Sequence, residues 1–261
     1  MKVAVLFRGG MSKKIGRLMM PEDINIESDY INYKCAYNSF KKHIIDANPS
    51  HSFDIFIHTW HPDLENDLKD LYKPIEIKTE NNSKYKSRIL YSLVNSNSHI
   101  SCFSIVSQAL SQKLVCKMVE KHCIKNNFEY DIIIIYRLDL LLIKDMILEN
   151  YDLNSITCNN WAHCWGDFHF VMNYKNMLKF AKIYDEFCPS LQPIVHQCTK
   201  MYVDKYLNIP YKQDDISAGI DQEVVRKAIN LIEKANINYD KLLLYNISEE
   251  EILSYNVDNR G

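Results

Sequence analysis

The sequence of 261 residues lacks the features that usually divide a chain into separate parts. It contains only 6 glycines and 7 prolines, and they do not gather into a linker. It also has no internal repeat and no low-complexity tract. We therefore predict one α/β domain, with enough chain to bury a sizeable core.

An excess of charge of one sign is missing as well. The 31 Lys and Arg residues nearly balance the 33 Asp and Glu residues, which gives a formal charge of −2. Domains that bind nucleic acid usually carry a basic excess, so we expect no such partner. The apolar run around Ile132–Ile135 is far shorter than the ~20 residues that a membrane-spanning helix needs, so we expect no transmembrane segment.

The eight cysteines include no C-x-x-C pair. Lys2 leads directly into an apolar run, so we expect no secretory signal, a cytoplasmic protein and reduced, buried thiols. A structural zinc site would show tighter paired spacing than the loose histidine and cysteine group of this chain, and zinc is the lesser alternative. That group is His163, Cys164, His169, His196 and Cys198.

Apolar runs of strand length alternate with segments of helical periodicity, which is typical of an α/β fold with a mostly parallel central sheet. The predicted strands are Lys2–Phe7, Phe53–Trp60, Ile75–Ile77, Tyr130–Asp139, Ile156–Cys158, Phe168–Met172 and Leu242–Tyr245. The predicted helices are Tyr30–Asp46, Asp63–Tyr72, Phe103–Asn126, Tyr174–Phe187, Val195–Leu207 and a helix that follows Ser217–Glu223 and extends to about Ala235.

Three details complete this reading of the chain. The polar segment Glu80–Ser101 is predicted to be an irregular loop that could act as a lid. Asn173 is predicted to cap the helix that follows it. Gln213–Asp215 is predicted to be an acidic loop.

The chemistry is expected where a buried strand ends in charged residues. Four isoleucines, Ile132–Ile135, predict a strand buried on both faces, and Arg137 and Asp139 follow it. Ligands of open α/β sheets bind at the carboxyl ends of strands, which favours a site there. The alternative is an ion pair that caps the strand.

Arg8, Gly9 and Gly10 follow the first predicted strand directly. Glycines at this point allow a tight turn and a close approach of a ligand, and an arginine can pair with phosphate. The stretch matches neither the Walker loop nor the G-x-G-x-x-G fingerprint, so a plain strand-to-helix turn is the alternative. The second strand ends in Thr59, which could hydrogen-bond a base or ribose, and Trp60, which could stack or simply pack.

Four segments together resemble a family of bacterial and viral polysaccharide-assembly proteins with a GT-A glycosyltransferase fold. The segments are Val3–Gly9, Phe53–Trp60, Tyr130–Leu140 and Trp165–Phe168, of which Phe53–Trp60 is the most specific. The resemblance implies a Rossmann-like single domain with a nucleotide-binding half at 1–140 and an acceptor-binding half at 141–261. It also implies a cytoplasmic protein of a bacterium, or of a host cell if the protein is viral.

The resemblance further implies a nucleotide-diphosphate-sugar donor, a glycan acceptor and a divalent metal ion, Mn²⁺ or Mg²⁺, held by an acidic triplet. The matching triplet here is Arg137-Leu138-Asp139, in which arginine replaces the first acid. We expect the metal at Asp139, and the alternative is that Arg137 pairs with the diphosphate and replaces part of the metal's charge.

The site residues that we predict on this basis fall into three groups. Asp167 is the candidate general base for an inverting transfer, and a strand-start cap or an acceptor-binding residue is its alternative role. Asp215 and Asp221 are reserve candidates for the base or a metal ligand. The nucleotide is expected on Phe7, Arg8, Gly9, Thr59, Trp60, Gln108 and Arg137, and the acceptor on Trp165, Asp215 and Asp221.

The predicted function is therefore transfer of a sugar from a nucleotide donor to a glycan. One alternative is a transferase that places a non-sugar group on glycans. The other is a glycan- or nucleotide-binding protein that keeps the fold without activity, because the triplet lacks its first acid.

Overall fold

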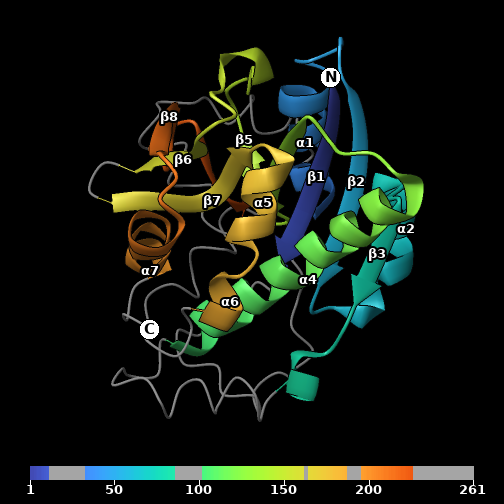
Figure 1. Ribbon diagram of the computed structural model, residues 1–261. Coiled ribbons are helices and arrows are strands. Elements are labelled where there is room, and N and C mark those ends of the chain that lie inside the picture. Colours follow the sequence, from blue (N-terminus) through green and yellow to red (C-terminus); the bar gives the residue numbers. More distant parts are fainter. Residues whose placement is uncertain (12–32, 86–101, 162–163, 187–194, 226–261) are drawn as a thin grey trace.

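The computed structural model describes residues 1–11, 33–85, 102–161, 164–186 and 195–225 of the chain (Figure 1). Their main feature is a seven-stranded sheet in the order β3-β2-β1-β4-β7-β6-β8. Every neighbouring pair is parallel except those made by β7, which runs antiparallel to β4 and β6. The predicted mixed, mostly parallel sheet is confirmed. The strands are β1 (Lys2–Gly9), β2 (Ser52–Thr59), β3 (Glu76–Thr79), β4 (Ile132–Arg137), β6 (Ile156–Trp161), β7 (Cys164–Met172) and β8 (Tyr211–Ser217).

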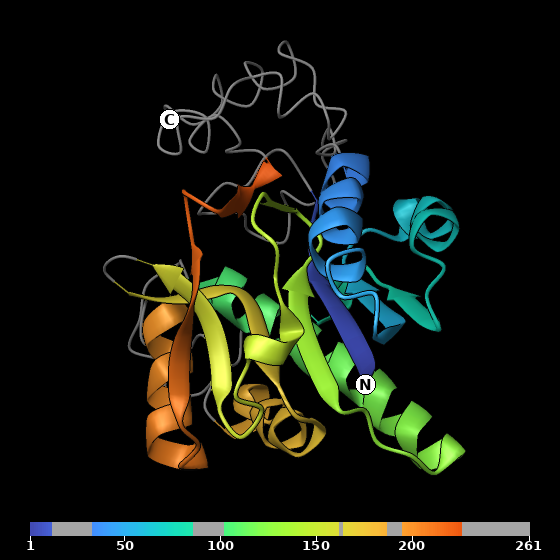
Figure 2. The same cartoon turned by 90° about the horizontal axis from the view of Figure 1, so that it is seen from above.

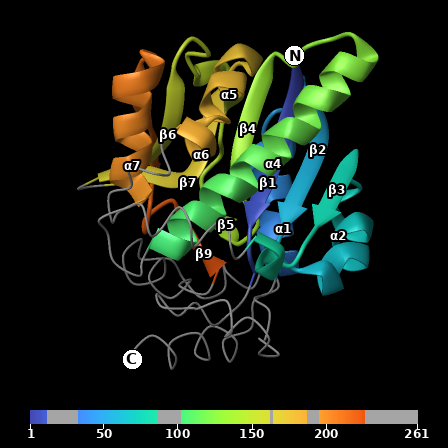
Figure 3. The ribbon, with the colours of Figure 1, turned by 60° about the horizontal axis from the view of Figure 1, so that its bottom comes forward.

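Helices cover both faces of this sheet (Figures 1 and 3). The long helix α4 (Cys102–Asn126) crosses one face, and α5 (Tyr174–Phe180), α6 (Ile183–Glu186) and α7 (Val195–Tyr202) pack on the same face. Helices α1 (Tyr33–Phe40) and α2 (Glu65–Tyr72) pack on the other. The short helical turns are Lys41–Ile45, Pro62–Leu64, Asn82–Tyr85, Leu148–Asn150 and Val203–Leu207.

The core lies on both sides of the sheet because β1 is apolar from Val3 to Phe7 and β4 is apolar from Ile132 to Tyr136. Side chains alternate along a strand, so Val5 packs on the α1 face and Leu6 on the α4 face. All four isoleucines of β4 are completely buried, as their uninterrupted run predicts.

A second, two-stranded sheet lies beyond the carboxyl end of β4. It pairs β5 (Leu140–Leu142) with β9 (Gln222–Val224) in antiparallel register. Figures 2 and 3 show β9 near the carboxyl ends of the central strands of the main sheet. The amide of Val225 also donates to the carbonyl of Asp139 at 2.7 Å. The chain that follows β8 is thereby fixed against the residues that follow β4.

Two predictions about the second half of the chain are wrong. Asp167 lies inside β7 and not at its start, because β7 begins at Cys164. Gln213–Asp215 belongs to β8, which pairs with β6, and is not a loop.

One predicted helix also needs correction. The helix expected at Tyr174–Phe187 is divided into α5 and α6. Gln222 and Glu223, which were expected to lead into a further helix, belong to β9 because they pair with β5. Nearly all of the helix expected to follow them, the strand at Leu242–Tyr245 and most of the proposed lid lie outside the described residues.

Other local predictions are confirmed. The side chain of Asn173 accepts a hydrogen bond from the amide of Asn176 at 2.8 Å and so caps α5. Gly9 has a φ of 103°, a conformation that favours glycine. Among the described residues, no helix is both long enough and apolar enough to cross a bilayer.

Candidate functional site

Two arginines stand side by side at the carboxyl ends of β1 and β4. Arg8 and Arg137 are direct partners in the parallel register of these strands. Arg8 is only 1% exposed, and the side chain of Arg137 is 17% exposed. Two buried guanidinium groups next to each other repel, so the fold must supply carboxylates or other acceptors around them.

Asp139 supplies both of its oxygens to Arg137. The Nε and Nη2 groups of Arg137 each donate to one carboxylate oxygen at 2.8 Å, in a bidentate pair. Burial by itself lowers the pKa of the Arg137 guanidinium, but Asp139, Asp167 and Glu223 raise it, and the net shift is upward. Arg137 is therefore a permanent cation among three carboxylates.

Arg8 connects β1 to β7. Its Nη2 group donates to the backbone carbonyl of Asp167 at 2.6 Å, while its buried Nε has no hydrogen-bond partner among the described residues. Burial lowers the pKa of Arg8 to about 10, although the Asp167 carboxylate acts in the opposite direction. Arg8 remains charged at neutral pH and has one donor without a partner in the described part of the chain, which suits an anionic ligand.

Asp167 is held from a second side by α4. The side-chain amide of Gln108 donates to Oδ2 of Asp167 at 3.0 Å. The structure thus brings together five of the predicted residues, which we call the arginine–carboxylate cluster: Arg8, Gln108, Arg137, Asp139 and Asp167. Sequence reasoning had placed Gln108 on the nucleotide, and here it orients the candidate base.

The turn after β1 is fixed by polar contacts from β2 and α4. The hydroxyl of Thr59 donates to the carbonyl of Gly9 at 2.9 Å, and the amide of Gly9 donates to Oγ of Ser111 at 3.3 Å. Nδ1 of His58 lies 2.8 Å from the hydroxyl oxygen of Ser111, and Nε2 of His58 lies 3.5 Å from Oε1 of Glu80. Gly9 and Thr59 therefore lie at the same sheet edge as the cluster, but the Thr59 side chain is completely buried.

Burial dominates the titration of His58. It lowers the pKa of the imidazole to about 4, even though Glu80 acts to raise it. Glu80 also forms ion pairs with Lys78 and Lys84 and accepts a hydrogen bond from Tyr85. Burial acts to raise the pKa of the Glu80 carboxyl, but these contacts lower it to about 2. His58 is therefore neutral and Glu80 ionised at pH 7.

The other predicted nucleotide residues take different places. Phe7 is a core side chain, with its ring 4.9 Å from that of Phe40 and 4.8 Å from that of Tyr72. Trp60 is partly exposed beyond β2 and contacts the rings of His58 and Tyr85 edge to face. Their roles toward a nucleotide stay predictions.

The predicted acceptor residues lie outside the cluster. The ring of Trp165 stacks on Tyr211 at 4.5 Å, and the ammonium of Lys200 lies 5.0 Å from its centroid. Asp215 is exposed and pairs with Lys144 at 2.9 Å. Asp221 accepts from the amide of Ser217 at 2.8 Å and closes the turn before β9.

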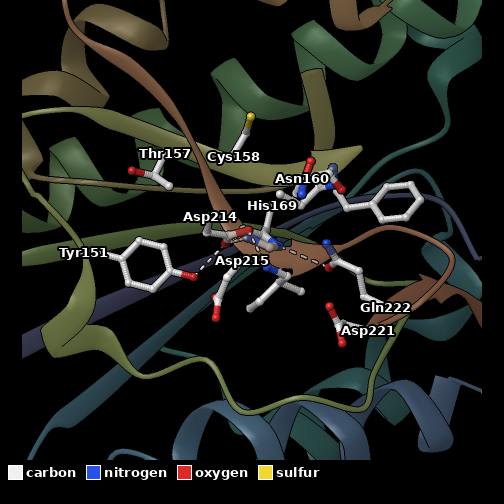
Figure 4. A network of polar contacts seen from close by, with 12 residues as sticks. Tyr151, Thr157, Cys158, Asn160, His169, Asp214, Asp215, Asp221 and Gln222 are labelled. Carbon is white, nitrogen blue, oxygen red and sulfur yellow. Dashed lines mark hydrogen bonds and ion pairs between the residues drawn. The ribbon is translucent and has the colours of Figure 1, made fainter. Parts of the chain in front are cut away.

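A buried polar network fixes β8 and β9 against β7 (Figure 4). His169 contacts Asp214 at 2.7 Å through Nε2 and Gln222 at 3.1 Å through Nδ1, and the hydroxyl of Tyr151 donates to Asp214 at 2.7 Å. Burial raises the pKa of Asp214, but the contacts with His169, Tyr151 and the amide of Ile216 lower it, with a net downward shift. Gln222 precedes Glu223, so the network positions the third carboxylate near Arg137.

Asp139, the carboxylate predicted to hold a divalent metal, is already paired in this arrangement. Among the described residues, no group of three His, Cys, Asp or Glu side chains is placed to hold one ion. Both oxygens of Asp139 accept hydrogen bonds from Arg137, so a metal would first have to displace the guanidinium. Of the histidine and cysteine group considered for zinc, His169 belongs to the polar network described above.

Glu223, Asp214 and the pair of His58 and Glu80 were missed as contributors to the site. His58 and Glu80 lie at strand ends, a position that could have drawn attention to them. Glu223 had no such signal, because its place depends on the pairing of β9 with β5, more than 80 residues apart in the sequence.

Comparisons with known proteins add little to these observations. No protein-family model matches the chain, and a search of curated proteins finds no match. The chain is similar to a crystal structure from Desulfovibrio desulfuricans G20, described as a "putative nucleotide-diphospho-sugar transferase". The two share 11% identity over 97% of each chain, with a TM-score of 0.46. A likeness this distant does not speak for the reaction, so the function rests on the residues of this chain.

Proposed function

We propose that this protein is a glycosyltransferase that moves a sugar from a nucleotide-diphosphate-sugar donor to a glycan acceptor. The observation that carries the proposal is the pair of Arg8 and Arg137 at the carboxyl ends of adjacent parallel strands. Arginine is well suited to bind phosphate, because its planar donors match the phosphate oxygens. The resemblance of Val3–Gly9, Phe53–Trp60 and Tyr130–Leu140 to glycosyltransferase segments agrees with it.

The arginines would act on the leaving group. Negative charge develops on the nucleotide diphosphate as its bond to the sugar breaks, and fixed cations in a buried site stabilise that charge. Nε of Arg8 has no partner in the part of the chain that the structure describes, and Arg137 donates to Asp139 from one edge of its guanidinium. No step of this mechanism requires a metal, and metal binding at Asp139 is an outcome of the test below.

Asp167 is the proposed general base for the acceptor hydroxyl. A base must be held in one orientation within hydrogen-bond reach of the proton that it removes. Gln108 fixes one carboxylate oxygen, and Arg8 fixes the backbone at the same residue. The Asp167→Asn variant should therefore keep donor binding and lose transfer if the reaction inverts configuration.

One observation favours a second candidate, a nucleotide- or glycan-binding protein without activity. The carboxylates of Asp139 and Asp167 both have partners within the chain already. Under this alternative, the nucleotide would bind but no sugar would be transferred.

A thermal-shift panel tests the proposal. UDP-, GDP-, CMP- and dTDP-sugars are each added to the wild type with EDTA and with Mn²⁺. A ligand at a hundredfold excess over its Kd stabilises the folded state by about 2.7 kcal/mol, which is readily detected. We expect one nucleotide class to shift the transition and the Arg137→Ala variant to lose the shift.

The other outcomes of the panel separate the alternatives. A shift that needs Mn²⁺ and disappears in Asp139→Ala would favour a metal-assisted site. A shift without transfer to any glycan would favour the inactive binding protein. If no donor shifts the transition of the wild type, the proposal is wrong.

A further inference from the structure

The strongest unexplained feature of the cluster is a guanidinium among carboxylates from three separate segments. Arg137 is bound bidentately by Asp139, and Asp167 from β7 and Glu223 from β9 act on it electrostatically. Asp139, Asp167 and Glu223 are 1%, 4% and 8% exposed. Buried carboxylates that lie near one another repel unless a cation neutralises them.

From this arrangement we infer that Arg137 is a built-in cation that takes the place of a divalent metal ion at Asp139. The inference rests on the proposed function and specifies how its site handles charge. It makes donor binding independent of metal, because the phosphate then contacts a guanidinium cation and not a metal ion.

The geometry supports this assignment in two ways. Each carboxylate oxygen of Asp139 accepts a hydrogen bond from the Arg137 guanidinium at 2.8 Å, so both oxygens face that positive charge. The neighbouring Arg8 is buried, and its Nε has no hydrogen-bond partner within the described ranges, so a second fixed cation lies at the carboxyl ends of these strands. A metal held next to these two guanidinium groups would be repelled by both.

The inference predicts that removing the guanidinium creates a metal site. Mn²⁺, like Mg²⁺, prefers oxygen ligands, and one or two carboxylates together with water are often enough to hold such an ion. In Arg137→Gln the Asp139 carboxylate loses its bidentate hydrogen bonds to the guanidinium, and a divalent cation can take their place. The matched control is Arg137→Lys, which keeps a positive charge at the same position.

The experiment measures Mn²⁺ alone, without nucleotide, by electron paramagnetic resonance of the free ion during a titration. We expect no Asp139-dependent binding in the wild type or in Arg137→Lys. We expect at least tenfold tighter binding of one ion in Arg137→Gln, lost again in the double variant Arg137→Gln/Asp139→Asn.

Two results would overturn the inference. One is a wild type that binds one Mn²⁺ ion and loses it in Asp139→Asn, a result that decides the matter even if Arg137→Gln does not fold. The other is a folded Arg137→Gln that gains no binding. Because no nucleotide is present, neither result depends on whether the protein binds nucleotide sugars, and the thermal-shift panel tests that separately.

Discussion

Gly9 and Gly166 both lie next to the cluster, and they are glycines for different physical reasons. Gly9 has open space for a Cβ atom but a φ of 103°, which other residues rarely adopt. Gly166 has no positive φ, but a Cβ atom there would lie 2.1 Å from Oδ1 of Asn159. That oxygen accepts a hydrogen bond from the amide of Phe168 at 2.9 Å, so it has little freedom to move.

We predict that Gly166→Ala lowers the free energy of unfolding by about 1–3 kcal/mol, the usual cost of overpacking a buried site. Urea denaturation of the wild type and the variant measures this change in the free energy of unfolding. Asn159→Ala removes the clash at the cost of a lost hydrogen bond. The double variant Gly166→Ala/Asn159→Ala should therefore lose less free energy of unfolding than the two single variants lose together. Additive effects would show that Asn159 is not the obstacle.

His58 makes a second prediction at the residue scale. Its pKa is about 4 in the folded protein against an ordinary value of 6.5. The unfolded chain therefore binds a proton that the folded protein does not, and His58 makes stability fall as pH decreases from 6.5 to 4. A shift of this size corresponds to about 3 kcal/mol.

The measurement compares the wild type with His58→Asn, which keeps a polar group near Ser111. Denaturant unfolding is followed at several pH values between 4 and 7.5. We expect the difference in stability between the two proteins to shrink as the pH falls through this range. A difference that stays constant would contradict a neutral, buried His58.

At the scale of elements, β8 shows where sequence reasoning succeeds and fails. The alternation of apolar strands and helices in the first half was predictable, because the short apolar run Ile132–Ile135 and the long helix-forming segment Cys102–Asn126 are local signals. Gln213–Asp215 reads as a polar loop because nothing local indicates that Asp214 points into a buried network with His169. Pairing with β6 overrides its local polarity.

The same element supplies a matched pair of neighbouring carboxylates. Asp214 has a side chain that is 7% exposed and contacts His169 and Tyr151, whereas the Asp215 side chain is 84% exposed. We predict that Asp214→Asn destabilises the protein by about 1–3 kcal/mol, because buried groups lose a charged partner. Asp215→Asn should change stability by less than about 0.5 kcal/mol.

Chemical denaturation at pH 7 distinguishes the two variants. The pKa of Asp214 is lowered in the folded protein, so its stabilisation is present above the ordinary carboxyl pKa of 3.8 and is lost as the pH falls below it. The gap between Asp214→Asn and the wild type should therefore close toward pH 3. An equal effect of both variants at pH 7 would speak against a structural network at Asp214.

At the scale of the whole molecule, the sheet order assembles the cluster. Arg8 and Arg137 are far apart in the chain and meet because β1 lies next to β4. Asp167 joins them because β7 runs antiparallel and so has its beginning at the carboxyl end of β4. The positions of Arg8, Arg137 and Asp139 at strand ends were predictable from the sequence. The contribution of Glu223 was not, because β9 is positioned by β5 and the buried network.

The central claim is that Arg8 and Arg137, at the carboxyl ends of β1 and β4, bind the diphosphate of a nucleotide sugar. The most direct measurement is calorimetric titration, in EDTA, of the nucleotide sugar selected by the thermal-shift panel into the wild type and Arg8→Gln. Glutamine keeps a donor for the carbonyl of Asp167 but removes the cation. Lys144→Gln, which removes an exposed cation paired with Asp215, is the control for loss of one positive charge.

We predict that Arg8→Gln weakens binding by about 10- to 100-fold, the loss expected for charge-assisted hydrogen bonds to phosphate, while Lys144→Gln binds like the wild type. A folded Arg8→Gln protein with an unchanged Kd would contradict the account, because the diphosphate would then bind elsewhere on the molecule.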